Sequence, residues 1–138
     1  MTAPLLDTHA WIGWVQADAR LGKHTIAALD ALAPDDRPSL PAICLWEVAM
    51  LVHLGHLDLG ESLRSWLDAA ADPRTVRILP ITAAIANEVT RIPESIHRDP
   101  ADRLIVATAR VHQLPVLTRD QAIRRSRLVE LWKERTGA

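Results

Sequence analysis

The sequence predicts an α/β fold with a central, mainly parallel sheet, formed by a single domain that spans residues 1–138. The first observation behind this prediction is that short apolar segments alternate with longer segments of helical pattern along the chain. The second is that 138 residues can bury a hydrophobic core without a disulfide or a structural metal. The third is that no repeat, low-complexity tract or linker divides the sequence.

The first third of the chain predicts two strands and two helices. Residues 4–6 are apolar and end at Asp7, which is typical of a short buried strand. Residues 10–16 have the apolar density of a helix, and a second helical segment over residues 23–32 ends before Pro34. Residues 37–40 are expected to form another short strand.

Two helices follow in the middle of the chain. Pro41 is expected to open a helix over residues 42–54, since proline suits the first turn of a helix. Gly55 stands where a C-terminal cap is expected. A further helix is expected over residues 61–71, and Asp72-Pro73 ends it.

The last third of the chain predicts strands over 76–79 and 115–118, with a final short strand over 128–132. Thr82 can cap a helix that runs to about Arg91. The helix over residues 100–112 is nearly all apolar in its middle, so we expect it to be buried on more than one side.

Composition and charge exclude several classes of protein. The formal net charge is −1, so nucleic-acid binding would require a local basic patch rather than a generally cationic surface. Cys44 is the one cysteine, which excludes an internal disulfide and fits a reducing cytosol. The first residues resemble no signal peptide, and no apolar run reaches the about 20 residues of a membrane span. We therefore expect a cytoplasmic protein without membrane contact.

Acidic residues follow the predicted strands at positions that converge in this type of fold. Asp7 directly follows the first strand and Asp120 follows the strand over 115–118, so parallel pairing would place both at one edge of the sheet. Asp102 lies in the first turn of the helix that leads into the second of these strands, and a right-handed crossover begins near the same edge. Glu47 has apolar neighbours, where a carboxylate is costly to bury unless a cation meets it.

Carboxylates without a cysteine or histidine cluster favour Mg²⁺ or Mn²⁺ as the bound ion. Such an ion polarises a phosphate oxygen and lowers the pKa of a bound water. The acidic residues therefore predict phosphodiester hydrolysis.

Each acid also has a structural interpretation. Asp7 and Asp120 could be turn residues at strand ends. Asp99-Pro100 has the pattern of an N-cap followed by proline, which makes Asp102 an acid of the first helical turn. Glu47 is the hardest to explain in this way. The structural interpretations do not account for the convergence of these acids on one edge of the sheet.

Other candidate residues are weaker. His53 and His56 have the spacing of a metal-binding pair, but no third ligand is evident. His9 is expected to orient the site or to pack against it. Basic residues could hold phosphates, although a solvated basic surface explains them equally well; they are Arg119, Arg124, Arg125 and Arg127.

Several blocks of the sequence resemble PIN-domain proteins and, more narrowly, the VapC-type toxins of bacterial toxin–antitoxin modules. The blocks are Leu5-Leu6-Asp7-Thr8-His9-Ala10, Trp46-Glu47-Val48, the segment Asp99-Pro100-Ala101-Asp102-Arg103-Leu104-Ile105-Val106-Ala107, and Leu117-Thr118-Arg119-Asp120. The resemblance covers essentially the whole chain in order and spacing.

The resemblance implies a three-layer α/β/α sandwich and an endoribonuclease that uses Mg²⁺ or Mn²⁺. It places the catalytic and metal-binding acids at Asp7, Glu47, Asp102 and Asp120. Asp99 belongs to the same block as Asp102 and is a further candidate ligand, and Thr8 and Thr118 match hydroxyl positions that line the site. The implied partners are a small antitoxin, an RNA substrate and a second copy of the chain.

Two other functions compete with this interpretation. A non-catalytic PIN-like module that binds RNA or protein would not need the acids. A haloacid-dehalogenase-type phosphatase, or an exonuclease with an Asp-x-Glu start, requires an acid where this chain has His9. A receiver domain requires an acidic pair before its phosphorylated aspartate and a late lysine, and Lys133 is the only late lysine. Apolar residues of the early helices, among them Trp11, Trp14 and Trp46, exceed what one core needs; we expect most of them in the core and some in a groove for an amphipathic antitoxin segment.

Overall fold

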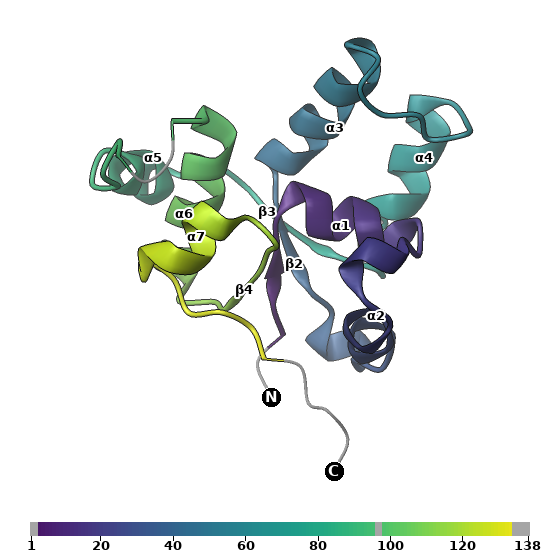
Figure 1. Ribbon diagram of the computed structural model, residues 1–138, viewed down its shortest axis with the longest axis horizontal. Helices are drawn as coiled ribbons and strands as arrows, with labels where there is room; N and C mark the ends of the chain where they lie inside the picture. Colours follow the sequence, from purple (N-terminus) through teal and green to yellow (C-terminus); the bar gives the residue numbers. More distant parts are fainter. Residues whose placement is uncertain (1–2, 96–97, 134–138) are drawn as a thin grey trace.

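The computed structural model describes residues 3–95 and 98–133. Its strands are β1 (Leu5–Leu6), β2 (Ser39–Pro41), β3 (Arg77–Leu79) and β4 (Val116–Leu117). They form a parallel sheet in the order β3-β2-β1-β4 (Figure 1). Leu5 of β1 is aligned with Ser39 on one side and Val116 on the other, so β1 lies inside the sheet.

Helices cover both faces of this sheet. Figure 1 shows α1, α2 and α4 on one side and α5, α6 and α7 on the other, which confirms the predicted three-layer sandwich. Their bounds are α1 (Thr8–Val15), α2 (Lys23–Asp30), α3 (Ile43–His53), α4 (Leu63–Ala70), α5 (Ala83–Val89), α6 (Pro100–His112) and α7 (Gln121–Ser126), with two short 3₁₀ turns, η1 (Ala19–Leu21) and η2 (Pro34–Asp36).

The helix α6 is buried on two sides, as its sequence predicted. Ile105 and Ala109 pack with the main core of β1, α1 and α3. Val106 and Ala107 pack into a second cluster, together with Ile123 of α7. Because two clusters hold α6, the acids in its first turn have a fixed position relative to the sheet.

Pro41 does not open a helix, contrary to the prediction. It is the last residue of β2 and is aligned with Leu79 of β3. Proline has no N–H to donate, and the N–H of Ala42 makes the next bond, to the carbonyl of Leu79 at 2.9 Å. The chain therefore continues as a strand through Pro41, and α3 begins at Ile43.

The C-terminal part also differs from the prediction. Residues 128–132 form no strand of their own, since Leu131 makes one isolated bridge with Val116. The helix α7 was not predicted, because its six residues bury only Ile123 and are too few to show a helical period. At the other end, α1 begins at Thr8 rather than at residue 10, with Asp7 as its N-cap.

In the described part of the chain, no helix combines the length and the apolar character that a membrane crossing requires.

Candidate active site at the carboxyl edge of the sheet

The candidate site lies where the order of the strands reverses. The chain proceeds from β1 to β2 and β3 in one direction, and β4 is then added on the opposite side of β1. Ligands of open α/β sheets bind at such a switch point, beyond the carboxyl ends of the strands. Asp7 and Thr118 directly follow Leu6 and Leu117, which are aligned residues of β1 and β4.

Asp7 is held by two hydrogen bonds. Its side chain is 4% exposed, and its Oδ1 accepts a hydrogen bond from the N–H of Ala10 at 2.8 Å, which caps α1. Its Oδ2 accepts a hydrogen bond from the hydroxyl of Thr118. Both carboxylate oxygens are therefore fixed before any ligand is present.

Thr118 connects Asp7 to Asp120. It is fully buried, and its Oγ1 also accepts a hydrogen bond from the N–H of Asp120 at 3.0 Å. Asp120 in turn caps α7, because its Oδ1 accepts a hydrogen bond from the N–H of Ile123 at 2.9 Å. The strand-end position predicted for Asp7 and Asp120 is thus observed, with one hydroxyl bonded to both residues.

A second threonine holds Glu47. The hydroxyl of Thr8, which is 2% exposed, donates a hydrogen bond to Oε1 of Glu47 on α3. Glu47 is half-buried, and it points toward the sheet edge although its sequence neighbours are apolar. Thr8 directly follows Asp7, so the residues that place Asp7 and hold Glu47 are neighbours at the start of α1.

The helix α6 begins at the same edge of the sheet and carries two further acids at its N-terminus. Asp99 is the exposed N-cap of α6, and its Oδ1 accepts a hydrogen bond from the N–H of Ala101 at 2.9 Å. Asp102 lies in the first helical turn and is half-buried. The N-cap pattern that the sequence predicted for Asp99-Pro100 is therefore observed. It does not decide which acid is a metal ligand.

Burial and mutual repulsion raise the pKa of two of these acids. For Asp7 the main cause is burial, and the charge of Asp120 raises its pKa further, while the hydrogen bond from Thr118 lowers it. For Glu47 the main cause is again burial, and the charges of Asp99 and Asp7 add to it. Within residues 3–95 and 98–133, neither acid forms an ion pair with lysine or arginine. Asp7 and Glu47 are therefore carboxylates whose charge a bound cation would stabilise.

The donor set fits a hard divalent cation in kind, since it consists of carboxylate and hydroxyl oxygens. As the side chains lie, no three His, Cys, Asp or Glu residues of the described ranges are arranged to enclose an ion. A physical reason is that Asp7, Asp99 and Asp120 each direct one oxygen at a helix N-terminus. The second oxygen of Asp7 accepts the hydrogen bond from Thr118, so binding of an ion would require these side chains to reorient.

The weaker candidates are placed as follows. Arg119 donates a hydrogen bond to the carbonyl of Leu21, and Arg124 donates one to the carbonyl of Thr118 at 3.0 Å, while Arg125 is exposed. His53 and His56 are exposed and belong to no group of three possible ligands among the described residues.

One residue near the site was not predicted to contribute to it. Arg103 donates hydrogen bonds to the carbonyls of Val89 at 2.9 Å and Ile92 at 2.5 Å, and so ties α6 to the end of α5. The available signal was its place directly after Asp102, because a long cationic side chain in a first helical turn can reach the preceding segment.

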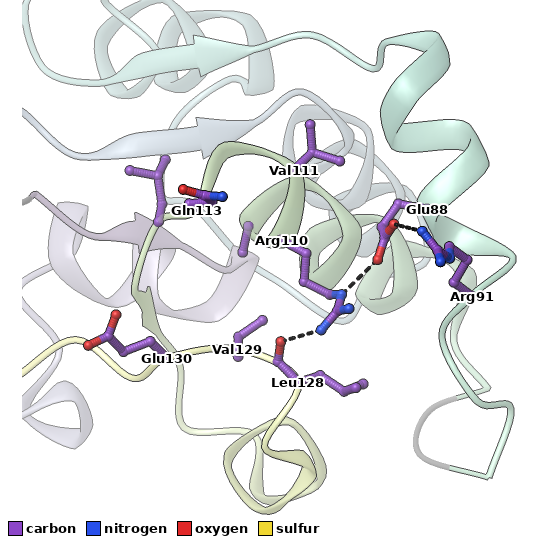
Figure 2. A pocket seen from close by; sticks show the side chains of 10 residues that line it. Glu88, Arg91, Arg110, Val111, Gln113, Leu128, Val129 and Glu130 are labelled. Carbon is purple, nitrogen blue, oxygen red and sulfur yellow. Dashed lines mark hydrogen bonds and ion pairs between the residues drawn. The ribbon is translucent and has the colours of Figure 1, made fainter.

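A cavity of about 450 Å³ lies away from these acids, which do not line it. Figure 2 shows Arg110 between Glu88 and the carbonyl of Leu128, at 2.8 and 2.7 Å respectively. These bonds join α5 and α6 to the segment that follows α7. Glu88 and Arg110 are bound to groups of the cavity lining itself, so we interpret the cavity as structural.

Of the three tryptophans considered for a docking groove, Trp11 lies in the core. It is fully buried and packs edge-on against Trp66, with ring centroids 5.0 Å apart. Its Nε1 donates a hydrogen bond to the carbonyl of Ala70, which fixes it in the core. Trp14 is partly buried, and Trp46 is 56% exposed. The groove itself stays a prediction.

Comparisons with known proteins agree with this architecture. The PIN-domain family model matches residues 5–127. The chain is 35% identical to Ribonuclease VapC22 of Mycobacterium tuberculosis over 127 residues, which cover 92% of this chain and 94% of that protein. The crystal structure of FitAcB from Neisseria gonorrhoeae is similar over 94% of this chain and 96% of its own, with 28% identity and a TM-score of 0.68.

A toxin–antitoxin complex from Klebsiella pneumoniae contains a chain with the same fold, at 22% identity and a TM-score of 0.59. The likeness covers 86% of this chain and 88% of that one. Together with the strand order and the positions of the acids, these matches give one assignment. The chain belongs to the PIN-domain family and, within it, to the VapC-type proteins.

Proposed function

We propose that this chain is a metal-dependent endoribonuclease that acts as the toxin of a toxin–antitoxin module. The observation that carries the proposal is the convergence of acids from β1, α3, α6 and β4 on one sheet edge, where Thr118 and Thr8 hold Asp7 and Glu47. The similarity to a protein named as a ribonuclease supports RNA as the substrate. Action on cellular RNA places the protein in the cytoplasm.

The proposed ligands of Mg²⁺ or Mn²⁺ are carboxylates, namely Asp7, Glu47, Asp99, Asp102 and Asp120. Bound among them, the ion would polarise a phosphate oxygen and lower the pKa of the attacking water. The chain's own contribution is to preorganise these groups. Thr118 fixes Oδ2 of Asp7 and Thr8 fixes Oε1 of Glu47, so Oε2 of Glu47 is the atom available to accept a proton from water.

The helix N-termini complete the electrostatics of this edge. Asp7, Asp99 and Asp120 cap α1, α6 and α7, so the positive ends of these helices face the acids. Such ends also favour a phosphate group. The same arrangement that tolerates clustered carboxylates would therefore accept an RNA backbone once a cation balances the charge.

The direct test of this proposal is cleavage of RNA by the purified chain. We expect endonucleolytic products with Mn²⁺ or Mg²⁺, none with EDTA, and none from Asp7→Asn, in which the cap is retained but the charge is lost. The exposed acid Asp35 on η2 provides a matched control, since Asp35→Asn should leave cleavage unchanged. Binding of RNA without cleavage in Mn²⁺ would favour the non-catalytic module instead.

The partner proposed for this toxin is a small antitoxin, and a homodimer within their complex stays a prediction. The same fold in a toxin–antitoxin complex supports this proposal. Expression of the chain alone should arrest bacterial growth, and co-expression of the adjacent small gene should restore it. Harmless expression of folded, RNA-cleaving protein would contradict the toxin role while leaving the ribonuclease in place.

A further inference from the structure

A second cavity, of about 370 Å³, opens beside the acidic site. It lies between α1, the turn η1 and the C-terminal end of α3, and Arg119 closes one end. Apolar side chains form part of its lining, among them Ile12, Leu21 and Leu51, and the exposed rings of His9 and His56 stand at its rim. Its volume falls within the roughly 300–1,000 Å³ typical of small-ligand sites.

Two residues of the cavity lining are neighbours of the acids in the sequence. His9 lies two residues after Asp7 in the first turn of α1, and Arg119 directly precedes Asp120. We infer that a strand of RNA with one phosphate at the acids could extend its next nucleotide toward this cavity. The acids do not line the cavity, so its occupant would be a neighbour of the reacting group.

Arg119 lines this cavity and is held in one orientation by a hydrogen bond. It reaches across to η1 and donates a hydrogen bond to the carbonyl of Leu21. Gly22 allows this approach, since a Cβ there would lie 3.3 Å from Nη2 of Arg119, and its φ of 100° disfavours other residues. The guanidinium is therefore held in place before any ligand arrives.

The charge of the lining favours an anionic partner. The one acid, Asp18, is paired with Arg20 at 2.7 Å, so Arg119 provides a cation that no acid of the lining pairs with. Histidine rings and arginine planes are surfaces on which unpaired RNA bases stack, and an apolar floor suits the face of a base. An acidic or purely apolar lining would instead have favoured a peptide.

We propose that this cavity is a subsite for the base of one nucleotide next to the cleaved bond, with His56 as its stacking surface. The inference rests on the proposed ribonuclease function and deepens it, because such a subsite would give the enzyme a preference for one base. His56 lies beyond the C-terminal end of α3 and is not one of the acids of the site, so its loss should change base recognition without removing the chemistry.

The test is an abasic scan of a single-stranded RNA 10-mer that spans a mapped cleavage site. Fluorescence anisotropy gives the Kd for each oligomer, with Asp7→Asn as the background so that the RNA stays intact. We expect one abasic position to weaken binding about tenfold, the size of a lost stacking contact. In His56→Ala that position should no longer matter. In His53→Ala, a matched change of an exposed histidine that does not line the cavity, it should matter as before.

Each outcome of this scan has a distinct meaning. Loss of the abasic effect in His56→Ala alone supports the subsite. An unchanged scan in His56→Ala, or the same loss in His53→Ala, overturns it while cleavage by the wild type still stands. Weaker binding of the antitoxin by His56→Ala, with RNA binding unchanged, also overturns it in favour of a peptide. If the wild type neither binds nor cleaves RNA, the proposed function itself fails.

Discussion

Thr118→Val removes the hydroxyl that links Asp7 and Asp120 while keeping the size of the side chain. The hydroxyl donates to a carboxylate that is 4% exposed and accepts from the N–H of Asp120, and Thr118 itself is fully buried. A hydrogen bond to a charged group contributes about 1.5–3 kcal/mol, and a bond from a backbone N–H contributes about 1 kcal/mol. We therefore expect a loss of about 2–4 kcal/mol in the free energy of unfolding.

The assay is thermal unfolding in EDTA at pH 7, followed by circular dichroism. For a chain of this length the expected loss corresponds to a decrease of roughly 10 °C in Tm. Thr108→Val is the matched control, because Thr108 is also buried but donates only to the carbonyl of Leu104 in its own helix. That change should cost less than about 1 kcal/mol. Equal Tm values for the two variants would refute the role given to Thr118.

The difference in Tm between wild type and Thr118→Val should also depend on pH. The bond from Thr118 lowers the pKa of Asp7, so it stabilises the ionised carboxylate. Its contribution is therefore present when Asp7 is ionised and is lost as the pH falls through the raised pKa of that group. The Tm difference between wild type and Thr118→Val should shrink in acid, and a difference that stays constant from pH 7 to pH 3 would contradict the assignment.

The remaining predictions concern the acids. Mn²⁺ should raise the Tm of the wild type relative to EDTA by mass action, and Asp7→Asn should lose this shift. In EDTA at pH 7, Asp7→Asn should be at least as stable as the wild type, because burial raises the pKa of Asp7 and ionising it costs stability as the pH rises; the advantage should vanish below the ordinary value of 3.8. Asp102→Asn should abolish cleavage yet melt within a few degrees of wild type, since its helix-end charge contributes about 0.3–1 kcal/mol. Asp99→Asn should leave the stability nearly unchanged, because Asn caps about as well as Asp, and it should retain more activity than Asp102→Asn; the reverse order of activities would reverse the assignment of the leading ligand.

The convergence of Asp7 and Asp120 on one edge of the sheet could be predicted because it follows from chain topology. Each of these acids follows an apolar strand, and parallel strands bring their carboxyl ends to one edge. The apolar middle of α6 likewise predicted its burial on two sides, because consecutive apolar residues in a helix point in different directions around its axis.

The contacts within the site could not be predicted from spacing. The bond from Thr118 to Asp7 joins residues 111 positions apart, and that from Thr8 to Glu47 joins residues 39 positions apart. The family resemblance indicated that both threonines line the site. Only the folded chain shows which carboxylate each hydroxyl meets.

The errors in the prediction have local physical causes. Pro41 suits both a first helical turn and the end of a strand, and the pairing of β2 with β3 places it in the strand. A count of apolar residues could not show which tryptophans lie in the core, because it does not show which face of α1 meets the core, where Trp11 packs against Trp66.

The central claim is that the acids at the β1–β4 edge bind the cation that RNA cleavage requires. The most direct measurement is a Mn²⁺ titration in which free Mn²⁺ is followed by electron paramagnetic resonance and the cleavage rate is recorded in the same samples. We expect the rate to rise in parallel with the bound Mn²⁺, and both to be lost in Asp7→Asn but not in Asp35→Asn, whose side chain is exposed on η2. Full Mn²⁺ binding and full cleavage in Asp7→Asn would contradict the claim.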